Sequence, residues 1–175
     1  DWSSDVCSSD LEKNGMHANG STGVAVLRRD GFVSYSAQKE KGTLVTRPVT
    51  FTGEYLFVNV NCPNGELKVE VLDADNKVIQ GFSANDCKPL TVDSTIAQIR
   101  WKNKKDLSTL KSQSVRFKFY LTNGDLYSFW VSPDTEGASN GYNAAGGPGF
   151  SGGIDKEGMR AYKKAQDFPN LLERC

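Results

Sequence analysis

Alternation of apolar and polar side chains with a period of two is the feature of this sequence that most limits its fold. Between Glu66 and Asp73, leucine and valine alternate with glutamate and lysine, and a similar alternation extends over Ser114–Thr122. Such a period places the apolar side chains on one face of a β-strand and the polar ones on the other. Each segment is therefore expected to form a strand with one buried and one solvated face.

Similar strand-like runs follow one another along the chain, separated by residues that favour tight turns. The expected strands are Val24–Arg28, Phe32–Ser36, Thr43–Phe51, Glu54–Asn61, Glu66–Asp73, Lys77–Phe82, Ile96–Trp101, Ser114–Thr122 and Asp125–Val131. Hairpins are expected at Asp30-Gly31, Asp75-Asn76 and Asn123-Gly124, and a further turn at Asn64-Gly65. Pro48 predicts an edge position or a bulge, because proline has no backbone N–H for a sheet ladder.

This series of strands predicts an all-β fold, an antiparallel two-sheet β-sandwich of the jelly-roll type. A parallel α/β sheet is excluded because it needs helices between its strands, and the one short helical candidate within the series of strands is Asp106–Lys111. The composition changes after Val131. Ser132–Gly153 is rich in glycine, alanine and asparagine and is expected to wrap the domain as a loop or to form a flexible tail, with a short helix in Asp155–Gln166.

The first eleven residues, DWSSDVCSSDL, are interpreted as an artefact. They match the translation of a widely used short-read sequencing adapter, and they precede a well-patterned domain abruptly. The expected organisation is an adapter-derived segment at 1–11, a linker at 12–23, the β-sandwich at 24–132 and the Gly-rich tail with its helix at 133–175. Because the adapter would mark the end of a read, the natural protein is expected to continue upstream.

Bulk composition limits the classes of partner. Hydrophobic residues make up 38% of the chain and charged residues 24%, which is ordinary for a globular domain. The formal net charge of zero argues against a nucleic-acid partner, which is usually held by neutralising phosphates. No apolar run approaches the roughly 20 residues of a membrane-spanning helix, so no membrane partner is expected.

Cysteines and oxygen-rich turns give no sign of a metal or a cofactor. Cys62, Cys87 and Cys175 have neither zinc-site spacing nor a disulfide framework. A Cys62–Cys87 bridge is one alternative, but Cys62 in a turn and Cys87 as a small half-buried thiol is the favoured interpretation. Asp73-Ala74-Asp75-Asn76 could offer oxygens to calcium, yet these residue types are equally typical of a hairpin turn, and no calcium site is expected.

Catalytic residues are not expected in this chain. The single histidine, His17, lies in the predicted linker, so no serine or cysteine triad can be assembled around a core histidine. Carboxylates are plentiful, but they fall in turns or on solvated strand faces, and no pair stands out as a glycosidase acid and nucleophile. Gly146-Gly147-Pro148-Gly149 lacks the lysine and hydroxyl residue of a phosphate-binding loop.

Aromatic residues are the best candidates for contact with a ligand, because sugars stack their C–H faces on aromatic rings. Tyr120 shares a strand face with Arg116 and is expected to be the most exposed ring, with Tyr35 second. The candidate carbohydrate-binding residues are Tyr120, Tyr35, Trp101 and Arg116. Phe129 and Trp130 are expected to pack in the core instead.

Five segments together suggest a family. They are GVAVLRRDGFVS (Gly23–Ser34), GTLVTRPVTF (Gly42–Phe51), YLFVNVN (Tyr55–Asn61), GELKVEVLD (Gly65–Asp73) and DLYSFWVS (Asp125–Ser132). This pattern resembles the C-terminal β-sandwich of bacterial glycoside-hydrolase-like proteins related to families 32 and 43, in which a five-bladed propeller carries the chemistry. The resemblance implies a secreted or periplasmic parent enzyme that acts on a poly- or oligosaccharide, with its catalytic residues in the missing propeller.

Three functions remain open on this basis. The first is an accessory module that supports an upstream catalytic domain of the same polypeptide and contacts sugar at its edge. The second is an autonomous carbohydrate-binding module, and the third is a structural or adhesion sandwich. If a domain attaches through Gly15–Ser36, Leu27 and Phe32 should be partly exposed in the isolated chain.

Overall fold

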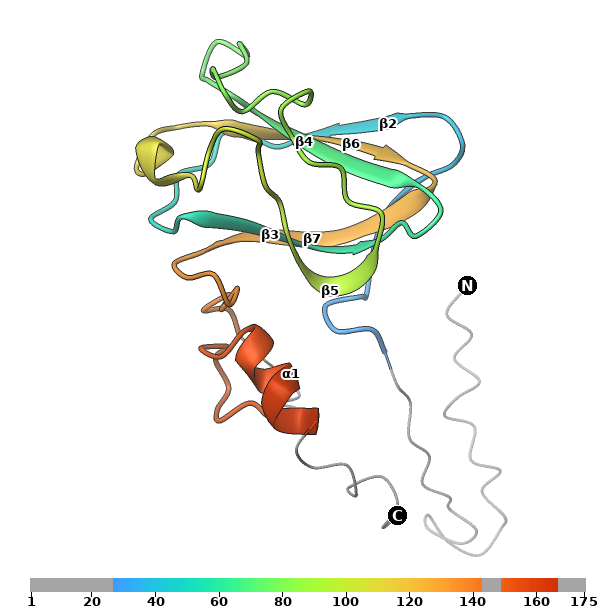
Figure 1. The fold of residues 1–175 in the computed structure, drawn as a ribbon, viewed down its shortest axis with the longest axis vertical. Coiled ribbons are helices and arrows are strands. Elements are labelled where there is room, and N and C mark those ends of the chain that lie inside the picture. The colour runs from blue at the N-terminus through green and yellow to red at the C-terminus, as the bar shows by residue number, and fades with distance from the viewer. Residues whose placement is uncertain (1–26, 143–148, 167–175) are drawn as a thin grey trace, which may run out of the picture.

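Seven strands form two antiparallel sheets that pack face to face in the structure, a computed structural model that describes residues 27–142 and 149–166 (Figure 1). The four-stranded sheet has the order β1 (Tyr35–Ala37), β7 (Gly124–Ser132), β3 (Tyr55–Asn61) and β5 (Asp93–Gln98). The three-stranded sheet has the order β2 (Gly42–Val45), β6 (Arg116–Thr122) and β4 (Glu66–Leu72). The predicted all-β two-sheet sandwich is confirmed, and β2 with Pro48 behind it lies at a sheet edge as expected.

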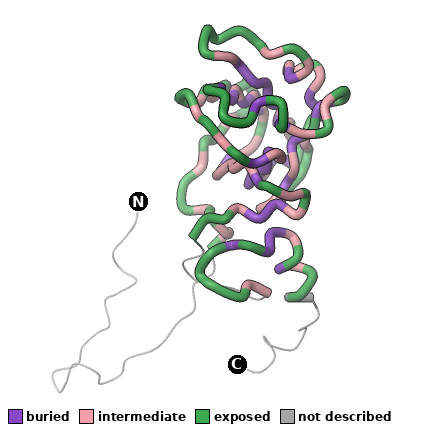
Figure 2. The backbone as a smooth tube through the Cα atoms, turned by 90° about the vertical axis from the view of Figure 1, so that its left-hand side faces the viewer, coloured by how far each residue is buried: buried purple, intermediate pink, exposed green. Residues whose placement is uncertain are grey.

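The hydrophobic core fills the space between the two sheets, as the buried segments in Figure 2 indicate. On β4 and β6 the apolar side chains that the alternation places inward are buried, including Val69 and Phe119, and Glu70 and Leu72 of β4 are buried as well. Phe129 of β7 packs across the interface against Phe117 and Phe119, with ring centroids 5.9 and 5.0 Å away. Edge and tilted contacts of this kind are the favoured geometries for aromatic rings, and they join the sheets at the centre of the core.

All six connections between successive strands cross from one sheet to the other. Three of these crossings, β1 to β2, β3 to β4 and β6 to β7, meet at the same end of the sandwich. The hairpin predicted at Asn123-Gly124 is therefore wrong, because β6 pairs with β2 and β4 whereas β7 pairs with β1 and β3. An Asn-Gly dipeptide signals a sharp reversal of the chain, but it does not say whether the two strands pair side by side or stack in opposite sheets.

Asn123 connects these three crossings by hydrogen bonds. Its backbone N–H donates to the carbonyl of Gln38 at 2.7 Å, and its side-chain amide donates to the carbonyl of Asn64 at 2.8 Å. Gly124 follows at a point where a Cβ atom would lie 2.6 Å from the Asn61 carbonyl oxygen. The chain crossings thus meet backbone against backbone, which only glycine allows at this distance.

Both neighbours of β3 bulge at the same place. Asn59 pairs with Ser128 and Val60 with Leu126, so β7 carries one extra residue between these pairs. The register of β5 shifts between Val58 and Val60 as well. A bulge interrupts the period-two pattern, and this makes the expected core position of Trp130 wrong.

Trp130 lies on the outer face of the four-stranded sheet instead. Its ring stacks on Phe57 with centroids 5.9 Å apart, and its Nε1 donates to the Gly137 carbonyl at 3.0 Å. β3 is consequently buried on both faces: Leu56, Val58 and Val60 face the core, while Phe57 and Asn59 are covered from outside.

The covering segment is the C-terminal cap, which comprises residues 133–142 and 149–166 and includes α1 (Met159–Gln166). It lies below β3 and β7 in Figure 1, on the side away from the three-stranded sheet. The described part of this segment forms a loop over the sheet, which is one of the two alternatives expected for it, and the helix begins at Met159 rather than near Asp155. The adapter segment 1–11, the linker 12–23 and residues 143–148 and 167–175 lie outside the described residues.

Several expected strands are shorter or shifted in the structure. Residues 27 and 28 belong to no strand, β1 replaces Phe32–Ser36, β5 replaces Ile96–Trp101, and Lys77–Phe82 keeps only a bridge between Val78 and Leu72. The expected helix Asp106–Lys111 is a single 3-10 turn at Ser108–Leu110. Phe82 and Trp101 are buried and pack edge to face at 5.2 Å without a regular strand around them.

Cys62 and Cys87 are both free thiols and both buried, so the alternative of a bridge between them is wrong. Burial raises the pKa of each thiol, which keeps them protonated. Asp73 accepts hydrogen bonds from the backbone of Asp75 and Lys77, which is turn chemistry as expected. In the described part of the chain, no helix has the length and apolar character needed to span a bilayer.

Replacing Gly124 by alanine should destabilise the fold by about 2 kcal/mol, because the new methyl group would collide with the backbone of Asn61 and Cys62. Urea unfolding measures the change. Gly152→Ala is the matched control, since nothing lies within 4 Å of a Cβ atom there. Equal unfolding midpoints for the two variants would contradict the tight packing of the crossings.

Candidate functional site

A turn at Arg28–Gly31 lies on the outer face of the four-stranded sheet and is anchored by Asn59. The Asn59 side chain is 1% exposed, and its amide donates to the Arg29 carbonyl at 2.6 Å while its oxygen accepts from Arg28 Nε at 2.7 Å. Arg28 also donates to the Val60 carbonyl at 3.0 Å, beside the bulges. A buried amide with both groups bonded holds this turn in one place.

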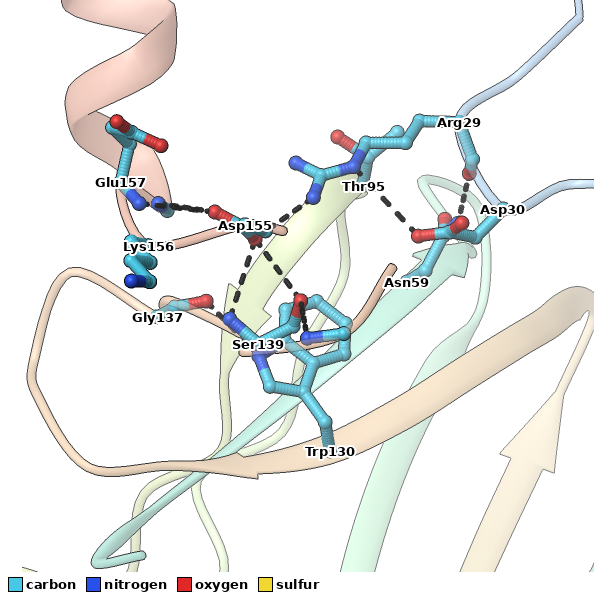
Figure 3. A network of polar contacts seen from close by, with 12 residues as sticks. Arg29, Asp30, Asn59, Thr95, Trp130, Gly137, Ser139, Asp155, Lys156 and Glu157 are labelled. Atoms are coloured by element: carbon cyan, nitrogen blue, oxygen red, sulfur yellow. Dashed lines mark hydrogen bonds and ion pairs between the residues drawn. The ribbon is translucent and has the colours of Figure 1, made fainter. Parts of the chain in front are cut away.

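Arg29 extends from this turn to the C-terminal cap and forms an ion pair with Asp155 (Figure 3). Arg29 Nη2 lies 2.8 Å from Asp155 Oδ2, and the Asp155 side chain is only 1% exposed. The same carboxylate accepts hydrogen bonds from Ser139, from the backbone N–H of Glu157 and from that of Gly158. One buried carboxylate therefore joins the N-terminal turn, the loop around Ser139 and the start of α1.

The pKa of Asp155 reflects these contacts. Burial by itself raises the pKa of this carboxyl, but the N–H of Gly158 and the Arg29 guanidinium outweigh it and hold the pKa below its ordinary value. Asp155 is therefore charged at neutral pH, and the charge is what keeps its donors in place.

Exposed apolar side chains lie close in sequence to both residues of this ion pair. Leu27 and Phe32, close to Arg29 in sequence, are 55% and 77% exposed, and Val33 is 78% exposed. Ile154, the residue before Asp155, is 48% exposed and pairs with Tyr142 in an isolated bridge. The expectation that Leu27 and Phe32 are partly exposed is confirmed. We name the set Leu27, Phe32, Val33, Tyr142 and Ile154 the apolar margin.

Tyr120 lies on the outer face of the three-stranded sheet, as expected, but it is half-buried among charged groups. Its hydroxyl donates to Glu70 Oε1 at 2.6 Å, and burial together with this bond raises its pKa. The ammonium groups of Lys41 and Lys118 lie 4.1 and 4.9 Å from the ring centroid. Two lysines over the ring leave little of it open to stack on a sugar.

The other predicted sugar contacts are scattered. Tyr35 is 40% exposed and donates from its hydroxyl to the Thr43 carbonyl, so it is the most accessible of the four. Trp101 is 4% exposed, with its Nε1 bonded to the Val69 carbonyl, and its ring belongs to the core. Arg116 is partly buried and donates to the Thr46 carbonyl. The structure does not bring these residues together into one platform.

A polar groove of about 510 Å³ lies instead at the end of the sandwich where the three crossings meet. The sequence did not predict this groove, because its residues come from three turns far apart in the chain. The asparagines in these turns could have indicated a polar site, but asparagine is also common in ordinary turns.

Among the described residues, no group of three or more histidine, cysteine, aspartate or glutamate side chains could hold a metal ion. His17 lies outside those residues. No protein-family model matches this chain, and no curated protein is significantly similar to it. The resemblance to the accessory sandwiches of glycoside hydrolases therefore stays a prediction from sequence.

Replacing Asp155 by asparagine should lower the free energy of unfolding by about 2 kcal/mol at pH 7, since Arg29 loses its charged partner. Because the folded-state pKa of Asp155 is lowered, its contribution is complete above about pH 4 and is lost as the pH falls below that value. The difference between wild type and variant should therefore shrink at acidic pH. Denaturant unfolding at pH 3, 5 and 7 measures it.

Asp75→Asn serves as the control for this series, since Asp75 is exposed in a turn. A difference between wild type and Asp155→Asn that stays constant down to pH 3 would contradict the role of the Asp155 charge.

Proposed function

We propose that this chain is a non-catalytic accessory β-sandwich of a glycoside hydrolase, which packs against an upstream catalytic domain of the same polypeptide. The apolar margin is the observation that carries this proposal. Isolated apolar side chains are normal on a protein surface, but several on one short segment indicate a contact surface. Here three of them fall between residues 27 and 33, on the segment through which a preceding domain would be joined.

The Arg29–Asp155 ion pair supports the same proposal. It fixes the N-terminal turn against the cap, so the apolar side chains on both are presented on a rigid support. Interfaces between domains of one chain commonly combine such apolar residues with surrounding polar groups. Arg28–Asp93 at 2.5 Å and Arg160–Asp134 at 3.4 Å are exposed ion pairs on the N-terminal turn and the cap and would supply such groups.

An autonomous carbohydrate-binding module is less well supported. Such modules usually present exposed aromatic rings to sugar, whereas Trp101 is buried and the Tyr120 ring is flanked by lysines. As part of the proposal, the parent enzyme works outside the cytoplasm, in the periplasm or secreted, because a polysaccharide substrate is found there.

The proposal is tested by changing Phe32 and Val33 together to serine. In this chain the double variant should unfold within about 0.5 kcal/mol of wild type, because neither side chain is buried. In the longer protein, obtained by recovering the upstream coding sequence, it should lower the melting temperature of the sandwich by several degrees.

Val45→Ser is the matched control, since Val45 is 44% exposed on the other sheet and should have no effect that depends on the upstream domain. Amide hydrogen exchange should also be slower at residues 27–36 in the longer protein than in this chain. Equal exchange and equal melting temperatures in the longer protein would overturn the proposal.

A further inference from the structure

The polar groove lies at the end of the sandwich where the chain crosses between sheets three times. Its residues come from the β1–β2, β3–β4 and β6–β7 connections and from the strand ends beside them. The groove is lined by Ser36, Ala37, Gln38, Asn61, Pro63, Asn64, Asn123, Gly124 and Asp125. It is separate from the apolar margin, although Ser36 follows that segment closely.

The floor of the groove is held in a fixed shape by main-chain contacts. Asn123 is bonded to the carbonyls of Gln38 and Asn64, one on each of the other two crossings. At Gly65 a Cβ atom would lie 2.0 Å from the Thr122 carbonyl oxygen, so these two turns pack as closely as backbones can. A site whose shape exists before a ligand arrives loses less conformational entropy on binding.

The side chains above this floor are available for hydrogen bonding. Within the described residues, the side-chain amides of Gln38, Asn61 and Asn64 make no hydrogen bond, and each offers donors and an acceptor. Asp125 Oδ1 accepts from the hydroxyls of Ser34 and Ser36, which orients the carboxylate. Its second oxygen remains an acceptor for a ligand.

The composition of the lining selects among classes of ligand. It contains no lysine, arginine or histidine, so phosphates, sulfates and uronic acids would find no positive charge, and Asp125 would repel them. Ala37 and Pro63 are the only apolar side chains in it, which is too few for a lipid or an aromatic compound. One carboxylate among amides is a poor site for calcium, which prefers several.

A neutral ligand rich in hydroxyl groups fits this lining. Each sugar hydroxyl donates one hydrogen bond and accepts others, and amides with a carboxylate match both needs. We propose that the groove binds a short stretch of an uncharged oligosaccharide, with Gln38, Asn61, Asn64 and Asp125 as its hydrogen-bonding partners. This inference rests on the proposed function, since it names the ligand that such an accessory sandwich holds.

The test begins with affinity electrophoresis of the chain in gels containing fructan, arabinan, xylan or galactan, with polygalacturonate as the charged comparison. At least one neutral polysaccharide should retard the chain, and polygalacturonate should not. Oligosaccharides of the retarding polymer are then titrated into the 15N-labelled chain, and side-chain amide signals of Gln38, Asn61 and Asn64 should shift.

A variant with Gln38 and Asn64 both changed to alanine should bind about tenfold or more weakly. It should remain folded, because Asn123 bonds to the main-chain carbonyls of both residues. Asn103→Ala, which removes an exposed amide that does not line the groove, should bind like wild type.

Four results would overturn the inference: no retardation by any neutral polymer, stronger retardation by polygalacturonate, binding abolished by EDTA, or binding lost in Tyr120→Ala but kept in the double variant. The serine variant at Phe32 and Val33 tests docking of the upstream domain and leaves the groove unchanged. Failure of the sugar test and failure of the docking test can therefore be told apart.

Discussion

The two hydrogen bonds of the Asn59 side chain are the interaction on which the outer half of this structure depends. A polar residue at the centre of a sheet face has to be bonded when it is covered, and here it bonds to the N-terminal turn. That turn directs Arg29 toward Asp155, and the ion pair holds the C-terminal cap over the ring pair of Phe57 and Trp130. A single buried amide thus organises a third layer on a two-layer fold.

The sequence predicted well whatever follows from local alternation, and poorly whatever depends on pairing between distant strands. β4 and β6 follow their pattern because neither contains a bulge and each has one face in the core. The position of Trp130 could not be predicted, because an extra residue opposite Asn59 reverses the faces within β7. The crossing at Asn123 was wrongly predicted to be a hairpin, because an Asn-Gly dipeptide favours a sharp turn both within one sheet and between two sheets.

The difference between local patterns and long-range pairing also explains which features of the candidate sites could be predicted. Exposure of Leu27 and Phe32 was expected from the attachment of a further domain through their segment, although both residues were placed in strands. The polar groove could not be predicted, since three separate turns build it. Single aromatic residues were weak predictors of a sugar site because half-buried rings such as Tyr120 find charged neighbours within their own sheet. A groove made of turns is recognisable only when the turns are seen together.

At the chain crossings, the residues that stabilise the fold differ from those whose side chains line the groove, and this affects which positions can vary. Glycines and main-chain hydrogen bonds stabilise the crossings. The side chains of Gln38, Asn61 and Asn64 make no hydrogen bond to their neighbours among the described residues. Substitutions at these three positions change the surface without disturbing the scaffold. Related chains could therefore vary the lining of this groove by a few point mutations, almost independently of the stability of the fold.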